Sequence, residues 1–259
     1  MDETKLPLTS HLAELRSRIV KLLLAWIATT AAAWSYKEEV FAFLLRPAIA
    51  SLGPDGGKLQ ALAPAEIFFT YMKCALLAGF VLALPVVFWQ IWGFIAPGLY
   101  PSEKRVALPF VLVSTLLFAC GAVFGYAVVF PIMFGFFAAF QNEFVEAAWT
   151  MREVFSFTTH MFLAFGVAFE LPVVVFFLAV AGIVDARQLL RGFKYAVLGS
   201  FVLAAVLTPT PDIVTQTLLA GPLCALYLLG VGAAFLVGAG RRRSAAETAR
   251  AGESSVTPV

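Results

Sequence analysis

The chain has 259 residues, of which 61% are hydrophobic and 13% are charged, and its net charge is +2. No water-soluble domain of this size needs so much apolar surface, and with a mean hydropathy of +0.90 the composition indicates an integral membrane protein. The charge pattern has no basic stripe for nucleic acid. The three cysteines lie singly inside apolar runs, so neither a disulfide nor a metal site is expected.

Six apolar stretches are predicted to cross the membrane as helices. They are Ile19–Trp34, Ile67–Trp92, Val106–Phe140, Phe155–Ile183, Phe193–Leu207 and Ile213–Val237. The third and fourth exceed the roughly 20 residues that a bilayer core requires, so they are expected to tilt or project beyond it. The fifth is short of that length, and we expect a short sixth span as well. The first is interpreted as a retained span rather than a cleaved signal peptide.

The basic residues predict the orientation. The first, third, fifth and last segments outside the membrane hold four, two, three and four Lys or Arg residues, which is 13 of the 18 in the chain. The positive-inside rule therefore places both termini in the cytoplasm, and an even number of spans agrees with that placement.

The first external segment is predicted to contain a short helix at the membrane interface, formed by Glu38–Arg46. Pro47 follows it directly. We expect this proline to end the helix and to belong to a cap on the external side.

The connector Phe94–Arg105 is short, rigid and charged, and long apolar runs lie on both sides of it. Three prolines, counting Pro109 just beyond it, and one glycine exclude a continuous helix here. Glu103, followed by Lys104 and Arg105, is therefore expected to be held at the membrane surface. A carboxylate fixed there suits a positively charged partner that arrives from the water side.

The amino-terminal segment that leads into the first span is predicted to be an amphipathic helix. Glu14 and Arg18 are four residues apart, so one interpretation is a surface ion pair beside arginines, including Arg16, that set the topology. The other interpretation makes Glu14 a second cytoplasmic carboxylate close to Glu103. The segment alone favours neither.

Glu170 lies near the middle of the fourth predicted span with apolar neighbours on both sides. A charge there costs about 2.5–3.5 kcal/mol even on lenient insertion scales, so this side chain should face protein or water. The structural alternative is a hydrogen bond that fixes helix packing. Pro172, two residues later, predicts a kink.

The segment from Thr208 to Asp212 predicts a tight external turn between the last two spans. Asp212 is expected to cap the sixth helix, and Gln216 lies one turn inside it.

Four segments, in this order and at compatible spacing, resemble the TatC family, the multi-span receptor subunits of the twin-arginine protein translocase. They are His11–Arg18, Phe94–Arg105, Phe165–Pro172 and Leu207–Gln216. The resemblance covers nearly the whole chain, and only the tail is uninformative.

The resemblance implies a pathway that exports folded proteins whose signal peptides carry paired arginines. In the family, the carboxylates that match Glu14 and Glu103 form the cytoplasmic site for that pair. The other residues expected at this site are Arg16, Arg18, Phe94, Lys104 and Arg105.

The resemblance also implies a curved, concave bundle in the bacterial cytoplasmic membrane that associates with itself and with single-span TatA- and TatB-type subunits. Glu170 would lie in a polar patch where a partner helix or the signal's helix docks, and Gln216, beside Thr208 and Asp212, would contact partner helices. The family draws on the proton-motive force, and neither a cofactor nor an enzymatic activity is expected.

Two other hypotheses stay open from the residues alone. Glu170 would be the relay group of a proton-coupled carrier for small solutes, or the chain would be a scaffold without a ligand of its own. The sequence shows no zinc-protease motif, P-loop or nucleophile elbow. In each case residues 1–240 are expected to form one membrane domain, and residues 241–259 a disordered cytoplasmic tail.

Overall fold

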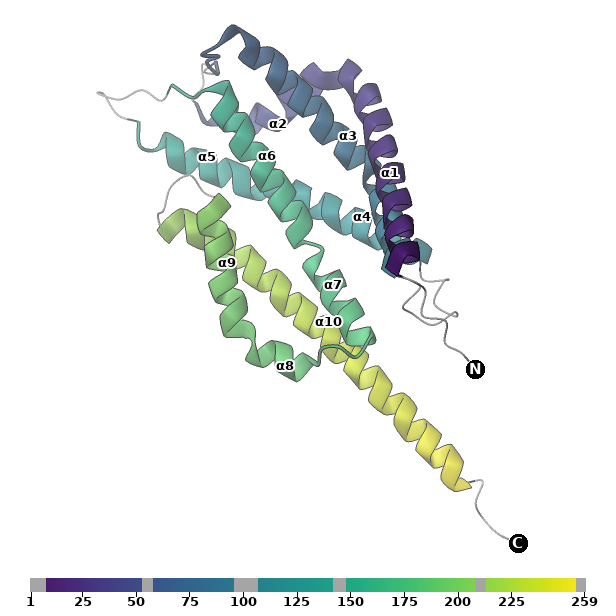
Figure 1. Cartoon of the computed structure of the whole chain (residues 1–259). Helices are drawn as coiled ribbons and strands as arrows, with labels where there is room; N and C mark the ends of the chain where they lie inside the picture. The colour runs from purple at the N-terminus through teal and green to yellow at the C-terminus, as the bar shows by residue number, and fades with distance from the viewer. Residues whose placement is uncertain (1–7, 53–57, 96–106, 142–147, 208–212, 255–259) are drawn as a thin grey trace. The chain divides into compact units, whose positions relative to one another are not determined.

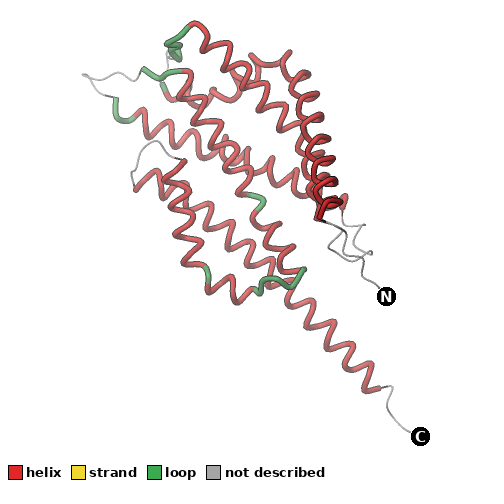
Figure 2. Tube along the Cα trace, in the orientation of Figure 1, coloured by secondary structure: helices red, strands yellow, loops and turns green. Residues whose placement is uncertain are grey.

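The computed structural model describes residues 8–52, 58–95, 107–141, 148–207 and 213–254 (Figure 1). Apart from turns and one isolated bridge between Gln60 and Thr150, this part of the chain is helical (Figure 2). The residues group into two compact units, Met1–Phe165 and Gly166–Val259.

The first unit contains six of the helices labelled in Figure 1, with two short turns between them. They are α1 (Leu8–Ala33), a 3-10 turn (Trp34–Tyr36), α2 (Lys37–Ser51), α3 (Pro64–Ile95), α4 (Ala107–Phe124), a π-helical turn (Gly125–Val129), α5 (Phe130–Ala138) and most of α6 (Met151–Ala168). Helix α1 packs along α3. The core between α3 and α4 is built from Leu84, Phe88, Val111 and Phe118, which large apolar side chains surround.

The second unit contains the end of α6 and the four helices that follow. They are α7 (Leu171–Val180), α8 (Ala186–Arg191), α9 (Phe193–Leu207) and α10 (Ile213–Ser254). Helix α10 packs against α7, α8 and α9. At Gly230 a Cβ would lie 3.2 Å from the Cβ of Val175, so the absence of a side chain lets α10 approach α7 closely.

The predicted spans are found as apolar helices in the described part of the chain. Five helical stretches there are long and apolar enough to cross a membrane, and Phe193–Leu207 is a shorter apolar helix, as predicted for the fifth span. The five are Leu12–Ser51, Pro64–Phe94, Leu108–Ala138, Met151–Val180 and Ile213–Leu236. The prediction of a short sixth span is wrong, because its apolar stretch has 24 residues, enough for a core of about 30 Å.

Pro47 does not end the external helix, which corrects the sequence prediction. Helix α2 runs from Lys37 through Pro47 to Ser51. A proline inside a helix leaves the carbonyl four residues earlier without its usual donor, and that carbonyl belongs to Phe43. Here the Tyr126 hydroxyl donates to the Phe43 oxygen over 2.8 Å, so the helix continues past the proline with this acceptor satisfied.

The fourth predicted span is broken near Pro172, where the sequence predicts a kink. Helix α6 ends at Ala168, two turn residues follow, and α7 begins at Leu171 (Figure 2). Pro172 has no N–H to donate to the carbonyl of Ala168, which would be its helical partner. The break leaves Glu170 at the amino-terminal end of α7.

The structure describes part of residues 241–259, for which the sequence predicts a disordered tail, as helix. Helix α10 continues as far as Ser254. Its extension is rich in Ala, Glu and Arg, which have high helix propensity. Because the extension adds to an existing helix, it incurs no nucleation cost.

Candidate functional site

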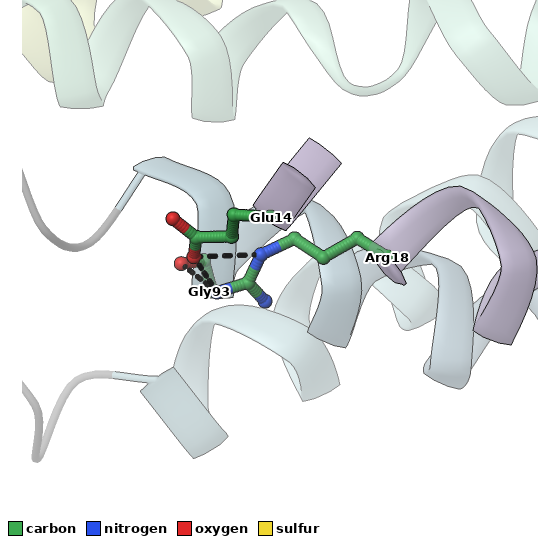
Figure 3. Close-up of polar contacts among 3 residues, drawn as sticks. All are labelled: Glu14, Arg18 and Gly93. Carbon is green, nitrogen blue, oxygen red and sulfur yellow. Dashed lines mark hydrogen bonds and ion pairs between the residues drawn. The ribbon is translucent and has the colours of Figure 1, made fainter. Parts of the chain in front are cut away.

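Glu14 and Arg18 form an ion pair on the first turns of α1. The Arg18 Nε and Nη2 atoms both donate to the same Glu14 oxygen, Oε1, and the Nε–Oε1 distance is 3.1 Å (Figure 3). The second oxygen, Oε2, lies on the side away from the guanidinium (Figure 3). The Glu14 side chain is 39% exposed and that of Arg18 is 23% exposed, so the carboxylate is the more accessible partner.

Arg18 also joins α1 to the end of α3. Its Nη2 atom donates to the Gly93 carbonyl oxygen over 2.7 Å (Figure 3). Helix α3 ends at Ile95, so the Gly93 carbonyl is one of the last four, which have no partner within the helix. A guanidinium is well suited to this place, because a helix carries partial negative charge at its carboxyl end.

Gly93 leaves the space that the guanidinium fills. A Cβ built on Gly93 would lie 2.2 Å from Nη1 of Arg18 and 3.0 Å from its Cζ. Any other residue at this position would therefore displace the guanidinium. Gly93 belongs to none of the motifs named above, and its only signal in the sequence is a glycine in a run of bulky apolar residues.

Further along the two helices, Trp26, Thr29 and Gly79 hold α1 against α3. The Trp26 indole Nε1 donates to the Leu76 carbonyl oxygen over 2.9 Å, and the Thr29 hydroxyl donates to the Gly79 carbonyl oxygen over 2.7 Å. A Cβ on Gly79 would lie 2.6 Å from the Thr30 Cα, so the two backbones are in close contact here. Such small-residue contacts hold membrane helices together.

The remaining residues predicted for this site are only partly described. Phe94 is half-buried in the last turn of α3, directly after Gly93, and Arg16 is exposed on α1. Glu103, Lys104 and Arg105 lie outside the described residues. The structure therefore places Glu14 beside the end of α3, where the connector toward Glu103 begins.

The intramembrane candidates belong to the second unit. Glu170 is half-buried and its Oε1 oxygen is shielded from solvent, as expected for an acidic group among apolar residues. Its neighbour Phe169 packs against Leu223 and Leu226 of α10. Gln216 is half-buried in the first turn of α10. Thr208 and Asp212 lie outside the described residues.

Glu66 is a polar anchor that the sequence analysis missed. It lies in the first turn of α3, and its Oε2 oxygen accepts the Leu62 and Ala63 N–H groups over 2.8 and 3.3 Å. Its Oε1 oxygen accepts the Arg152 N–H over 2.8 Å. Glu66 therefore joins the starts of α3 and α6, beside the bridge between Gln60 and Thr150. A glutamate at the third position of a helix is a typical capping-box signal.

Within the described ranges, no group of three or more His, Cys, Asp or Glu side chains could hold a metal ion.

Comparisons with known proteins agree with the motifs. Residues 10–222 match the family model TatC, described as the Sec-independent protein translocase protein. A TatC protein from Desulforapulum autotrophicum is 44% identical over 230 residues, which cover 89% of this chain and 84% of the relative. The TatC protein of Escherichia coli K12 is 38% identical over 238 residues, which cover 92% of each chain.

A solved structure shows the same fold. The crystal structure of a twin-arginine translocase receptor, TatC, superposes with a TM-score of 0.78 at 35% sequence identity, and the match covers 88% of this chain and 99% of that one. The predicted resemblance and the helical fold are confirmed. The chain belongs to the TatC family, and it is a multi-pass inner-membrane protein of twin-arginine protein transport.

Proposed function

We propose that this chain is the signal-peptide receptor of its translocase and binds the paired arginines of a signal through the carboxylates of Glu14 and Glu103. The observation that supports this most is the geometry of Glu14. Its carboxylate side chain is 39% exposed, accepts two N–H groups on one oxygen, and has its second oxygen on the side away from the guanidinium (Figure 3).

The chemistry of the two partners explains why arginine is preferred. A guanidinium presents a planar set of N–H donors to carboxylate oxygens, and a lysine ammonium cannot copy that geometry. Each exposed pair contributes only about 0–1 kcal/mol. Much of the affinity therefore comes from the apolar segment of the signal lying against the helices of the receptor.

The connector that carries Glu103 begins where Arg18 binds Gly93. Only seven residues separate Ile95, the last residue of α3, from Glu103, so this short connector supports a site shared by the two carboxylates. The excess of Lys and Arg in the first, third, fifth and last segments places this end of α1 and both termini in the cytoplasm. The receptor would then bind the signal peptide on the cytoplasmic side, before the cargo protein crosses the membrane.

Assembly with the single-span TatA- and TatB-type subunits and with further copies of the receptor is part of this proposal. Glu170 at the break before α7 and Gln216 in α10 are the polar side chains expected to contact partner helices, together with Thr208 and Asp212. Polar side chains within membrane-spanning segments commonly mark functional sites. Transport then uses the proton-motive force.

Photo-cross-linking tests where the signal binds. A twin-arginine signal peptide with a photoreactive residue beside the arginine pair is added to the purified chain in nanodiscs, and adducts are mapped by mass spectrometry. We expect adducts within residues 8–20 and 94–106, and fewer with a Lys-Lys peptide. Equal labelling of other helices by both peptides would contradict the site. Uptake of a small solute by vesicles that contain only this chain would favour the carrier.

A further inference from the structure

The Arg18 side chain does more than neutralise Glu14. One guanidinium binds the carboxylate of α1 and the terminal carbonyl of α3 at the same time, through Nε and Nη2. The carboxylate is therefore fixed to the end of another helix and cannot turn freely with its own side-chain torsions. Both of these N–H groups bind Oε1, and Oε2 lies on the side away from the guanidinium (Figure 3).

We propose that Arg18, seated on Gly93, is the positioning residue that makes Glu14 selective for arginine over lysine. This inference rests on the proposed function of the same site. A fixed carboxylate with one oxygen already bound presents its other oxygen to the directed N–H group of an arginine in one geometry. A free carboxylate would turn toward any cation, including the compact and flexible ammonium of lysine. Selectivity therefore depends on the contact between Arg18 and Gly93.

Gly93 supplies the sharpest probe of this role. In Gly93→Ala the new methyl group would lie 2.2 Å from the Arg18 Nη1 atom, which is too close for both to keep their positions. The obstacle is the far end of a flexible side chain, so the guanidinium moves aside and the helices keep their packing. This variant changes neither the net charge nor Glu14 itself.

The effect of the Arg18 charge can be separated from its positioning effect by comparing the affinities of an Arg-Arg peptide and a Lys-Lys peptide. Removing a positive charge strengthens the binding of an Arg-Arg peptide and a Lys-Lys peptide alike, so their dissociation constants fall together. Loss of positioning instead lowers the preference for the Arg-Arg peptide. The ratio of the Lys-Lys to the Arg-Arg dissociation constant therefore reports positioning alone.

The experiment measures this ratio by fluorescence anisotropy for the full chain in nanodiscs. The variants are Arg18→Gln, Arg18→Lys and Gly93→Ala, and thermal unfolding confirms that each is folded. We expect all three to lower the ratio by about two- to fivefold, the factor that one exposed ion pair is worth. Arg18→Lys belongs in this group because an ammonium keeps the charge but lacks the planar fork.

Two matched controls complete the design. Lys21→Gln removes one exposed positive charge one turn further along α1, and Gly135→Ala adds a methyl group where no atom lies within 4 Å. Both should leave the ratio unchanged.

The outcomes separate the two proposals. If the wild-type chain shows no preference for the Arg-Arg peptide, the proposed function fails. If the wild type discriminates but Arg18→Gln or Gly93→Ala keeps its ratio, the positioning role is overturned and the receptor function survives. A rise of the ratio in Arg18→Gln would also overturn it, because Arg18 would then be a competitor for Glu14.

Discussion

The Tyr126 hydroxyl donates a hydrogen bond of 2.8 Å to the Phe43 carbonyl, which Pro47 leaves without a helical donor. The rings of Phe43 and Tyr126 are stacked with their centroids 4.4 Å apart. Tyr126 lies in the π-helical turn between α4 and α5, so this turn directs the Tyr126 hydroxyl toward the α2 carbonyl that lacks a helical donor. Turns of this kind often mark a special local role.

A double-mutant cycle tests this relationship. Tyr126→Phe keeps the ring and should destabilise the wild type by about 0.5–1.5 kcal/mol, the net value of a hydrogen bond. In a Pro47→Ala background the amide of residue 47 donates to Phe43, so the same change should cost close to nothing. The measurement is unfolding in detergent as the mole fraction of SDS is raised. An equal cost in both backgrounds would contradict the account.

Gly79→Ala should loosen the contact of α1 with α3. The new Cβ would lie 2.6 Å from the Thr30 Cα, and a backbone atom cannot move aside as a side chain does. The expected cost is about 1–3 kcal/mol, typical of overpacking. Gly135→Ala is the matched control, since its Cβ would meet no atom within 4 Å. Thermal unfolding in detergent compares the two, and equal melting temperatures would argue against tight packing at Gly79.

Glu66→Ala should loosen the starts of α3 and α6 together. The carboxylate accepts N–H groups from Leu62, Ala63 and Arg152, so its removal leaves three donors to solvent. Hydrogen exchange followed by mass spectrometry should become faster in peptides that contain Leu62 and in those that contain Arg152. Glu153→Ala removes an exposed acid from the first turn of α6 and serves as the control. Faster exchange near Leu62 alone would disprove the link between the helices.

Glu170→Ala should impair assembly with TatA- and TatB-type subunits while signal binding is kept. Glu170 and Glu14 belong to different units of the chain. We expect the dissociation constant of a twin-arginine peptide to stay within about twofold of the wild type, as for independent sites. Co-purification with the partner subunits should fall. Lost peptide binding in a folded Glu170→Ala protein would refute this separation of roles.

The helices of this fold follow from the sequence because long apolar runs have few alternatives in a membrane. Pro172 likewise predicts the break before α7, since the missing donor acts on its own helix. The same rule gives a wrong prediction at Pro47, which does not end α2. Its effect depends on Tyr126, which is 79 residues away in the chain, and the sequence gives no sign that the two meet.

The candidate site shows the same limit. The spacing of Glu14 and Arg18 predicts their ion pair, because residues four apart face each other on a helix. The contact of Arg18 with Gly93 joins two helices across 75 positions, and no periodicity encodes it. The role of Gly93 depends on a guanidinium from another helix, which fills the space of its absent side chain.

The most direct test of the receptor function is the affinity of a labelled twin-arginine signal peptide and its Lys-Lys version for the chain in nanodiscs. We predict that the twin-arginine peptide binds more tightly. Glu103→Gln should weaken it more than Glu14→Gln, because the prolines in the sequence predict a rigid connector around Glu103, and each loss should reach at most about fivefold. Equal affinities for the two peptides, unchanged by Glu103→Gln, would contradict the proposal that these carboxylates read the arginine pair.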